Sequence, residues 1–99
     1  MTNQEFIQKL EENFQRGIEI IKAKNHDYAT DADPWKNFRF ADLVGVGVDR
    51  AILVRVSDKL ARISNLLDKQ AMVADEKVED TVLDAINYLN ILLVYLQAK

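Results

Sequence analysis

Hydrophobic residues recur along most of the chain at every third or fourth position, which is the spacing of one face of an α-helix. The first such run follows Thr2, whose hydroxyl is suited to cap a helix, and Glu5 stands three residues later as in a capping box. The apolar positions of this run are Phe6, Leu10, Phe14, Ile18 and Ile21. We therefore predict a first helix over residues 2–24.

The next segment lacks this period. Residues 25–34 contain many turn-forming residues and end at Pro34, which disfavours helical geometry at Asp33. We predict a loop here, followed by a short aromatic segment of one or two helical turns. This aromatic segment contains Trp35, Phe38 and Phe40 and ends at the break Gly45-Val46-Gly47.

Two further long helices are predicted in the second half of the chain, which has no proline and no glycine after Gly47. The first runs from Val48 to about Lys69, and the second begins after Asp75, a residue type suited to an N-cap. The apolar stripe of the first is Ile52, Val56, Leu60, Ile63 and Leu67. The predicted core stripe of the second is Val78, Val82, Ala85, Leu89, Leu93 and Leu96.

These elements predict a single all-α domain over residues 1–99, built as an antiparallel helical bundle of three long helices plus a short helix or loop. Ile91, Val94 and Tyr95 lie off the predicted core stripe, so the C-terminal half of the last helix is apolar nearly all round. Because three helices cannot easily surround such a helix, we expect a homodimer or homotetramer to complete the bundle. In the alternative, segment 25–45 folds over it.

Composition narrows the range of partners. The chain is 48% hydrophobic and 29% charged with a net charge of −3, so it should fold but offers no positive field for duplex nucleic acid. It has no cysteine, which excludes thiolate ligands and thiol nucleophiles. Since no apolar run reaches the ~20 residues of a membrane span and the N-terminus has no signal-like region, we expect a cytoplasmic protein without a membrane partner.

Candidate chemistry gathers on one face of the last helix, where Asp80, Asp84, Asn87 and Tyr88 lie close together. We expect this polar face to pack against protein. Two carboxylates one turn apart repel each other when partly desolvated, and a divalent cation bound by oxygen ligands, Mg²⁺ or Mn²⁺, would neutralise them. The alternatives are a solvated pair of carboxylates and a salt bridge to another helix.

The preceding helix carries a charged side at helical spacing, formed by Arg55, Asp58, Lys59 and Arg62. Asp58 would add an acid to a cation site, and the basic residues would hold phosphate oxygens. A charged side opposite an apolar stripe is also typical of a solvated surface, so that interpretation stays open.

Segment 25–38 combines aromatic and hydrogen-bonding side chains. Trp35 and Phe38 offer flat rings on which a base can stack, and neighbouring amides or carboxylates can bind its edge. Equally, the two rings can plug the open end of the bundle. The polar candidates here are Asp27, Tyr28, Lys36 and Asn37.

Three stretches of this sequence resemble the phage and bacterial domain called nucleotide modification associated domain 1, which is similar to the all-α nucleoside triphosphate pyrophosphatase (MazG-like) group. The resemblance covers roughly residues 20–95. Its first stretch is Lys24-Asn25-His26-Asp27-Tyr28 leading to Pro34-Trp35-Lys36-Asn37-Phe38, and its second is Arg55-Val56-Ser57-Asp58-Lys59-Leu60-Ala61-Arg62-Ile63. The third is Glu79-Asp80-Thr81-Val82-Leu83-Asp84-Ala85-Ile86-Asn87-Tyr88.

The resemblance implies hydrolysis of a nucleotide between its α and β phosphates with Mg²⁺ held by helix-borne carboxylates. By position, Asp80 and Asp84 would be metal ligands, with Asp58 as the candidate from the preceding helix. Lys59 and Arg62 would contact phosphates, while Asp27, Tyr28, Lys36 and Asn37 would approach the base or sugar. The MazG-like pattern of Glu-x-x-Glu and Glu-x-x-Asp is replaced here by Asp58-Lys59 and Asp80-x-x-x-Asp84.

Three functional hypotheses follow from the sequence. The first is a magnesium-dependent nucleotide pyrophosphohydrolase, with Glu79 or Glu76 as general base and Asn87 and Tyr88 beside the substrate. The second is a non-catalytic module of phage or prophage origin that binds a nucleotide or a protein through the same surface. The third is a purely structural helical module, against which Asp84, placed between Leu83 and Ala85, weighs most.

Overall fold

The computed structural model describes the backbone of residues 1–28, 33–69 and 77–99, and the side chains of these residues except 25–28. Within these ranges the chain forms three α-helices and one 3-10 helix, which confirms the predicted all-α class. No helix in the described part of the chain is both long and apolar enough to cross a membrane. The last helix begins at Val78 with Lys77 at its N-cap position, so the prediction of Asp75 as the N-cap was wrong. Asp75 and the candidate base Glu76 themselves lie outside the described residues.

The helices are α1 (Asn3–Tyr28), η1 (Lys36–Val44), α2 (Val48–Asp68) and α3 (Val78–Gln97). The predicted cap of the first helix is confirmed, because the Glu5 N–H donates to Thr2 Oγ1 at 3.1 Å. α1 extends four residues beyond its predicted end, so residues 25–28 are helical rather than loop. Nothing between Lys24 and Tyr28 breaks a helix once it has formed, and extending an existing helix is easier than starting one.

η1 is also longer than the one or two turns predicted, since it spans nine residues. It ends at Gly45, whose φ of 77° is left-handed and whose N–H bonds back to the last turn. Glycine adopts this conformation without the steric cost that a Cβ would bring, so the glycine break was predicted correctly.

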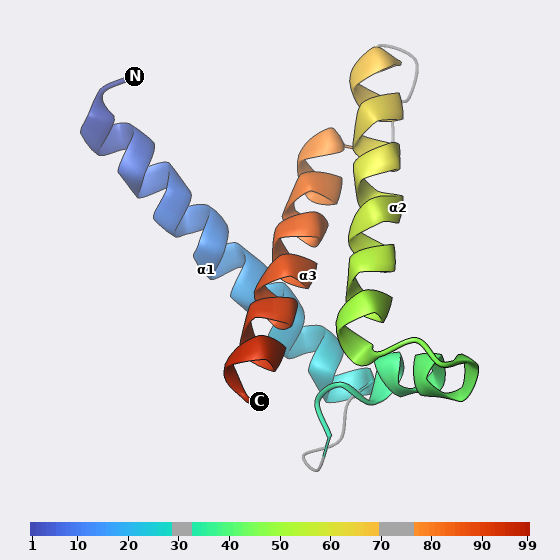
Figure 1. Ribbon diagram of the computed structural model, residues 1–99. Coiled ribbons are helices and arrows are strands. Elements are labelled where there is room, and N and C mark those ends of the chain that lie inside the picture. Colours follow the sequence, from blue (N-terminus) through green and yellow to red (C-terminus); the bar gives the residue numbers. More distant parts are fainter. Residues whose placement is uncertain (29–32, 70–76) are drawn as a thin grey trace.

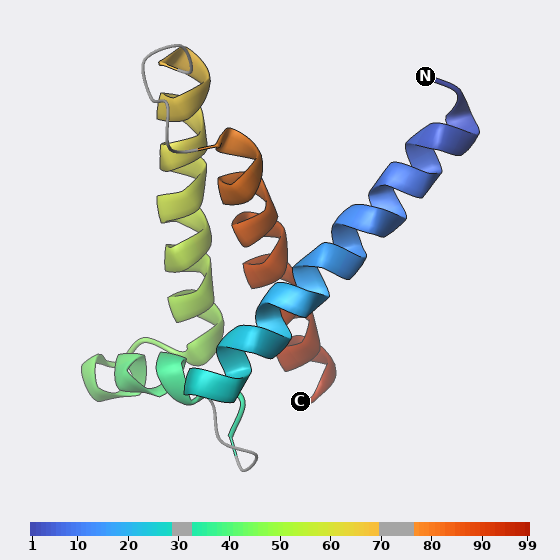
Figure 2. The same ribbon diagram turned by 180° about the vertical axis from the view of Figure 1, so that it is seen from behind.

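α2 and α3 lie antiparallel and side by side, whereas α1 crosses α3 on one side of that pair (Figures 1 and 2). The C-terminal half of α1 lies near α3 and η1, but the N-terminal half diverges from the other helices (Figure 1). The predicted stripe of this diverging half is consequently exposed, with Phe6 at 50% and Phe14 at 56% of their surface.

The core lies mainly between α2 and α3. Ile52 and Val48 are its most deeply buried side chains, and Val56 and Leu66 extend it along α2. Two members of the predicted α2 stripe, Ile52 and Val56, are therefore confirmed as core. Two others, Leu60 and Leu67, are 58% and 60% exposed, so for them the prediction was wrong.

The predicted core stripe of α3 was wrong over most of its length, because Val82, Leu89, Leu93 and Leu96 are 39–51% exposed. Of the predicted stripe, Ala85 is buried as expected, and Thr81 is buried one turn before it on the same side of the helix. The other buried residues of α3, Leu83 and Asn87, lie on the opposite side, against Gly17 of α1. Alanine, threonine and asparagine are small enough to let α2 and α1 approach closely. A helix that is apolar on more than one side does not itself determine which side becomes core.

Candidate functional site

A pocket of about 780 Å³ opens between the C-terminal end of α1, the start of η1, α2 and α3. It lies on the side of the α2/α3 pair that α1 crosses, which faces the reader in Figure 2. Its volume is within the range of small-molecule sites in proteins. The residues that line it are Ile18, Ile21, Lys24, Pro34, Trp35, Asn37, Phe38, Arg55, Tyr88, Asn90, Ile91 and Val94.

Aromatic rings from two elements form part of the pocket wall. Phe38 meets Tyr88 edge to face, with ring centroids 6.4 Å apart. Trp35 meets Tyr95 in the same manner at 5.4 Å, and Lys99 Nζ lies 5.2 Å from the centroid of the Tyr95 ring. These contacts fix the angle of the rings and leave apolar surface directed into the pocket.

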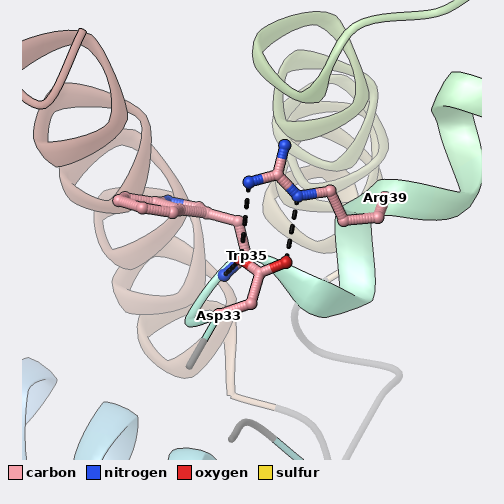
Figure 3. Close-up of polar contacts among 3 residues, drawn as sticks. All are labelled: Asp33, Trp35 and Arg39. Carbon is pink, nitrogen blue, oxygen red and sulfur yellow. Dashed lines mark hydrogen bonds and ion pairs between the residues drawn. The ribbon is translucent and has the colours of Figure 1, made fainter. Parts of the chain in front are cut away.

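Asp33 holds the segment that carries Trp35 (Figure 3). Its Oδ1 accepts a hydrogen bond from the Trp35 N–H at 3.1 Å, and its Oδ2 accepts one from Arg39 Nε at 3.0 Å. The hydrogen bond from Arg39 holds the pKa of the Asp33 carboxyl below its ordinary value, and the same bond raises the pKa of Arg39. The entry to η1 is therefore tied to an ionised aspartate.

The pocket lining includes two cations and two amides, besides the polar N–H of Trp35 and hydroxyl of Tyr88. Lys24 of α1 and Arg55 of α2 approach from different helices, and both side chains are exposed at the rim. Asn37 and Asn90 supply amide donors and acceptors from η1 and α3. Flat apolar walls, neutral amides and two positive charges suit a ligand with an aromatic ring and an anionic group.

A smaller cavity of about 60 Å³ adjoins the pocket and connects it with the polar face of α3. It shares four lining residues with the pocket, and Asp84 and Asn87 also line it. Asp84 Oδ2 lies 3.4 Å from Lys59 Nζ, and each side chain is 29% exposed. A salt bridge to another helix, one of the alternatives considered for this carboxylate, is thus present.

The other candidate carboxylates do not join Asp84 in one cluster. Asp80 pairs with Arg16 of α1 at 2.8 Å, while Asp58 and Glu79 are exposed. Among the residues that the structure describes, no three His, Cys, Asp or Glu side chains come together as a metal site would require. The described carboxylates of one chain therefore do not assemble the Mg²⁺ or Mn²⁺ centre expected from the sequence.

The predicted site residues therefore fall into three groups. Asn37 and Tyr88 line the pocket, and Asn87, Asp84 and Lys59 lie beside it or at the adjoining cavity. Asp58, Glu79, Lys36 and Arg62 are exposed, and Asp80 is paired with Arg16. Asp27 and Tyr28 belong to the end of α1, but their side chains lie outside the described residues.

Asn87 lines the adjoining cavity and also joins two helices. Its side chain is buried, and its Nδ2 donates to the Gly17 carbonyl of α1 at 3.2 Å. The polar face of α3 accordingly packs against protein, as the sequence predicted. One of its polar side chains, Asn87, stabilises the crossing of α1 and α3 through this hydrogen bond.

Sequence analysis did not assign Lys24 or Asn90 to the site and gave Arg55 no role different from that of its charged neighbours. Arg55 and Arg62 are one heptad apart on α2, but only Arg55 lies at the level of η1 and lines the pocket. The sequence placed Lys24 at the end of the first helix, directly before a loop. The helical continuation to Tyr28 places it beside the pocket instead.

Comparisons with known proteins give no match, either to a protein family, to a curated protein or to a solved structure. The similarity noted in the sequence therefore depends on its three short stretches alone. The structure brings residues from all three to one pocket: Lys24, Trp35 and Phe38 from the first, Arg55 from the second and Tyr88 from the third.

Proposed function

We propose that this protein binds a nucleotide in the pocket between α1, η1, α2 and α3. The observation that supports this most is the combination of aromatic rings with two cations in one pocket. A nucleotide has the matching parts, a flat base and a negatively charged phosphate group. The three sequence stretches that resemble a nucleotide-associated domain also supply these residues.

The base would lie against the aromatic side of the pocket. Trp35 and Phe38 present ring surface there, and Asn37 and Asn90 can donate to and accept from the edge of a base. Since Asp33 fixes the backbone at Trp35 and the Tyr95 ring supports the indole, little side-chain ordering remains to be done on binding.

The phosphate end would lie between Lys24 and Arg55. A guanidinium binds two phosphate oxygens at once, and an ammonium adds a compact charge from the opposite wall. None of the described residues that line this pocket is acidic, which favours an anion there. Both cations are exposed at the rim and can reach a ligand before it is fully enclosed.

Isothermal titration of purified protein with nucleoside mono- and triphosphates, with and without Mg²⁺, tests this proposal. We expect saturable binding by at least one nucleotide, and Arg55→Ala should weaken it about tenfold or more through loss of a charge-assisted hydrogen bond. Arg50→Ala is the matched control, because Arg50 is an exposed arginine of the same helix outside the pocket lining.

The proposal fails if no nucleotide binds, or if Arg55→Ala and Arg50→Ala bind with equal affinity. Trp35→Phe tests separately whether the base of the nucleotide lies against this ring. It keeps a ring in the wall and should retain most of the affinity, whereas Trp35→Ala should not.

Hydrolysis of the bound nucleotide is a second candidate, favoured by the position of Asp84 at the adjoining cavity. In that reaction a water oxygen bonds to the α-phosphorus and pyrophosphate leaves from a triphosphate. A half-buried carboxylate beside the phosphate end would hold the attacking water. Pyrophosphate release, measured with and without Mg²⁺, should then be lost in Asp84→Ala while nucleotide binding persists. If wild type releases no pyrophosphate under either condition, the protein binds the nucleotide without hydrolysing it.

A further inference from the structure

α3 carries an apolar row that its own chain does not cover. Val82, Ile86, Leu89, Leu93 and Leu96 follow one another at alternating steps of four and three residues, which is the heptad spacing of helices that pack on a second helix. Four of these side chains are 39–51% exposed. The residues that pack within the chain lie on other sides of the helix.

α2 carries a matching row of leucines at seven-residue intervals, Leu53, Leu60 and Leu67, which are 46%, 58% and 60% exposed. Ser57 and Ser64 stand between them at the intervening heptad positions. None of the residues in the two rows is charged. We call the α2 row and the α3 row together the outer face.

Helix geometry places both rows on the same side of the α2/α3 pair. At about 100° per residue, the leucine row lies on one flank of the buried Ile52 and Val56, and Arg55 lies on the opposite flank. On α3 the apolar row and Tyr88 likewise flank the buried side toward α2. Since the helices are antiparallel, Arg55 and Tyr88 meet at the pocket, and the two apolar rows meet on the far side.

The figures agree with this placement. In Figure 1 α3 lies in front of α1, and in the reverse view of Figure 2 α1 lies in front of α3. α1 and the pocket therefore occupy one side of the pair. No described element of the chain crosses the other side (Figure 1).

The amount of exposed surface is that of a subunit rather than of a closed monomer. The chain exposes 7711 Å², whereas a folded monomer of 11.4 kDa exposes roughly 5,800 Å². The excess is roughly 1,900 Å², and the diverging half of α1 contributes part of it (Figure 1). One chain contributes about 1,000–2,500 Å² to an obligate homodimer, so the remainder is of the size that a second copy would cover. The radius of gyration, 15.5 Å, also exceeds the value of about 13 Å for a compact chain of this length.

We propose that a second copy of this chain covers the outer face, so that two α2/α3 pairs pack as a four-helix bundle with both pockets directed outward. A second copy fits because a heptad row packs best against another heptad row, and the same rows face each other across a two-fold axis. The outer face has no charged side chain of its own, so contact between the rows buries no charge. This proposal does not depend on nucleotide binding.

The test is the mass in solution of two matched variants. Leu60 and Val54 are 58% and 57% exposed on the same helix, but Val54 lies away from the leucine row. Wild type and Val54→Glu should have a mass of about 23 kDa, twice the 11.4 kDa chain. Leu60→Glu should weaken association at least about a hundredfold, because two-fold symmetry buries the new charge twice.

Light scattering after size exclusion gives these masses, and circular dichroism shows whether each variant is folded. A Leu60→Glu dimer as tight as wild type would overturn the proposed surface. If Leu60→Glu does not fold alone, wild type decides: a melting temperature that rises with protein concentration supports the dimer. A mass of one chain at every concentration would overturn the proposal.

Discussion

At Gly17 α1 lies close against α3. A Cβ built there would lie 2.6 Å from Asn87 Oδ1 and 3.3 Å from Leu83 Cδ1. The same asparagine donates to the Gly17 carbonyl, so the two residues specify the crossing together. Glycine in a helix usually costs about 1 kcal/mol relative to alanine. Here it permits a close approach that orients the part of α1 that carries Lys24.

We expect Gly17→Ala to destabilise the protein by about 1–3 kcal/mol, because overlap with a buried amide outweighs the gain in helix propensity. Urea unfolding measures this change. In an Asn87→Ala background the overlap with the amide is absent, so Gly17→Ala should become neutral or stabilising. An equal cost in both backgrounds would show that the amide is not the cause.

Asp33 makes the geometry around Trp35 dependent on pH. Its folded-state pKa is below the ordinary 3.8, so its contribution is present above that pH and is lost as the pH falls through the folded pKa. We expect Trp35 fluorescence to be constant from neutral pH down to about pH 4 and to change below it. In Asp33→Asn this transition should be missing; an identical acid transition in both proteins would contradict the assignment.

At the scale of the helix, α1 has two halves that differ in what stabilises them. The C-terminal half packs on α3, whereas the N-terminal half diverges and depends on local interactions (Figure 1). The cap formed by Thr2 and the exposed pair of Lys9 and Glu12, 3.6 Å apart, are interactions of this kind. An exposed pair contributes little, so the cap is the stronger of the two.

We expect Thr2→Ala to destabilise the first turns of α1 locally by about 1 kcal/mol and to leave the global melting temperature nearly unchanged. Amide exchange at Glu5 should speed up, while amides of α3 should not respond. Thr2→Ser, which keeps the hydroxyl, is the matched control. A matching drop in global stability would mean that the N-terminal half of α1 is packed more firmly than the structure shows.

The helices themselves could be predicted from local patterns, since capping residues, glycines and the apolar period lie close together in sequence. Which side of α3 forms the core could not. Leu89 and Leu93 belong to the predicted apolar stripe but are exposed, whereas Thr81 and Asn87, outside that stripe, are buried, and Asn87 binds the Gly17 carbonyl of α1. That choice depends on contacts between distant segments, which local periodicity does not contain.

Only part of the site could be predicted, because the site also depends on contacts between distant segments. Asn37 and Tyr88 were identified from residue type and line the pocket. Lys24 and Arg55 act as a pair only because α1 continues as a helix and α2 begins beside η1. The carboxylates that suggested a metal from their spacing along α3 are instead paired with Arg16 and Lys59. Lys59 belongs to the charged side of α2 that the sequence placed beside these carboxylates, whereas Arg16 was not identified.

At the scale of the whole molecule, the α2/α3 pair separates two surfaces of different character. One side holds the pocket with its rings and cations, and the other holds the uncharged outer face. In the proposed dimer the two pockets are far from the contact between chains and remain open. Binding and association should therefore be separable by mutation on opposite sides of the same two helices.

The most direct test of the account is an NMR titration that follows the indole N–H of Trp35, the single tryptophan of the chain, as nucleotide is added. We predict a saturable shift of this signal, accompanied by the side-chain amides of Asn37 and Asn90, and its loss in Arg55→Ala. An indole signal that stays in place across a panel of nucleotides, or that shifts equally in Arg55→Ala, would contradict the claim that this pocket binds them.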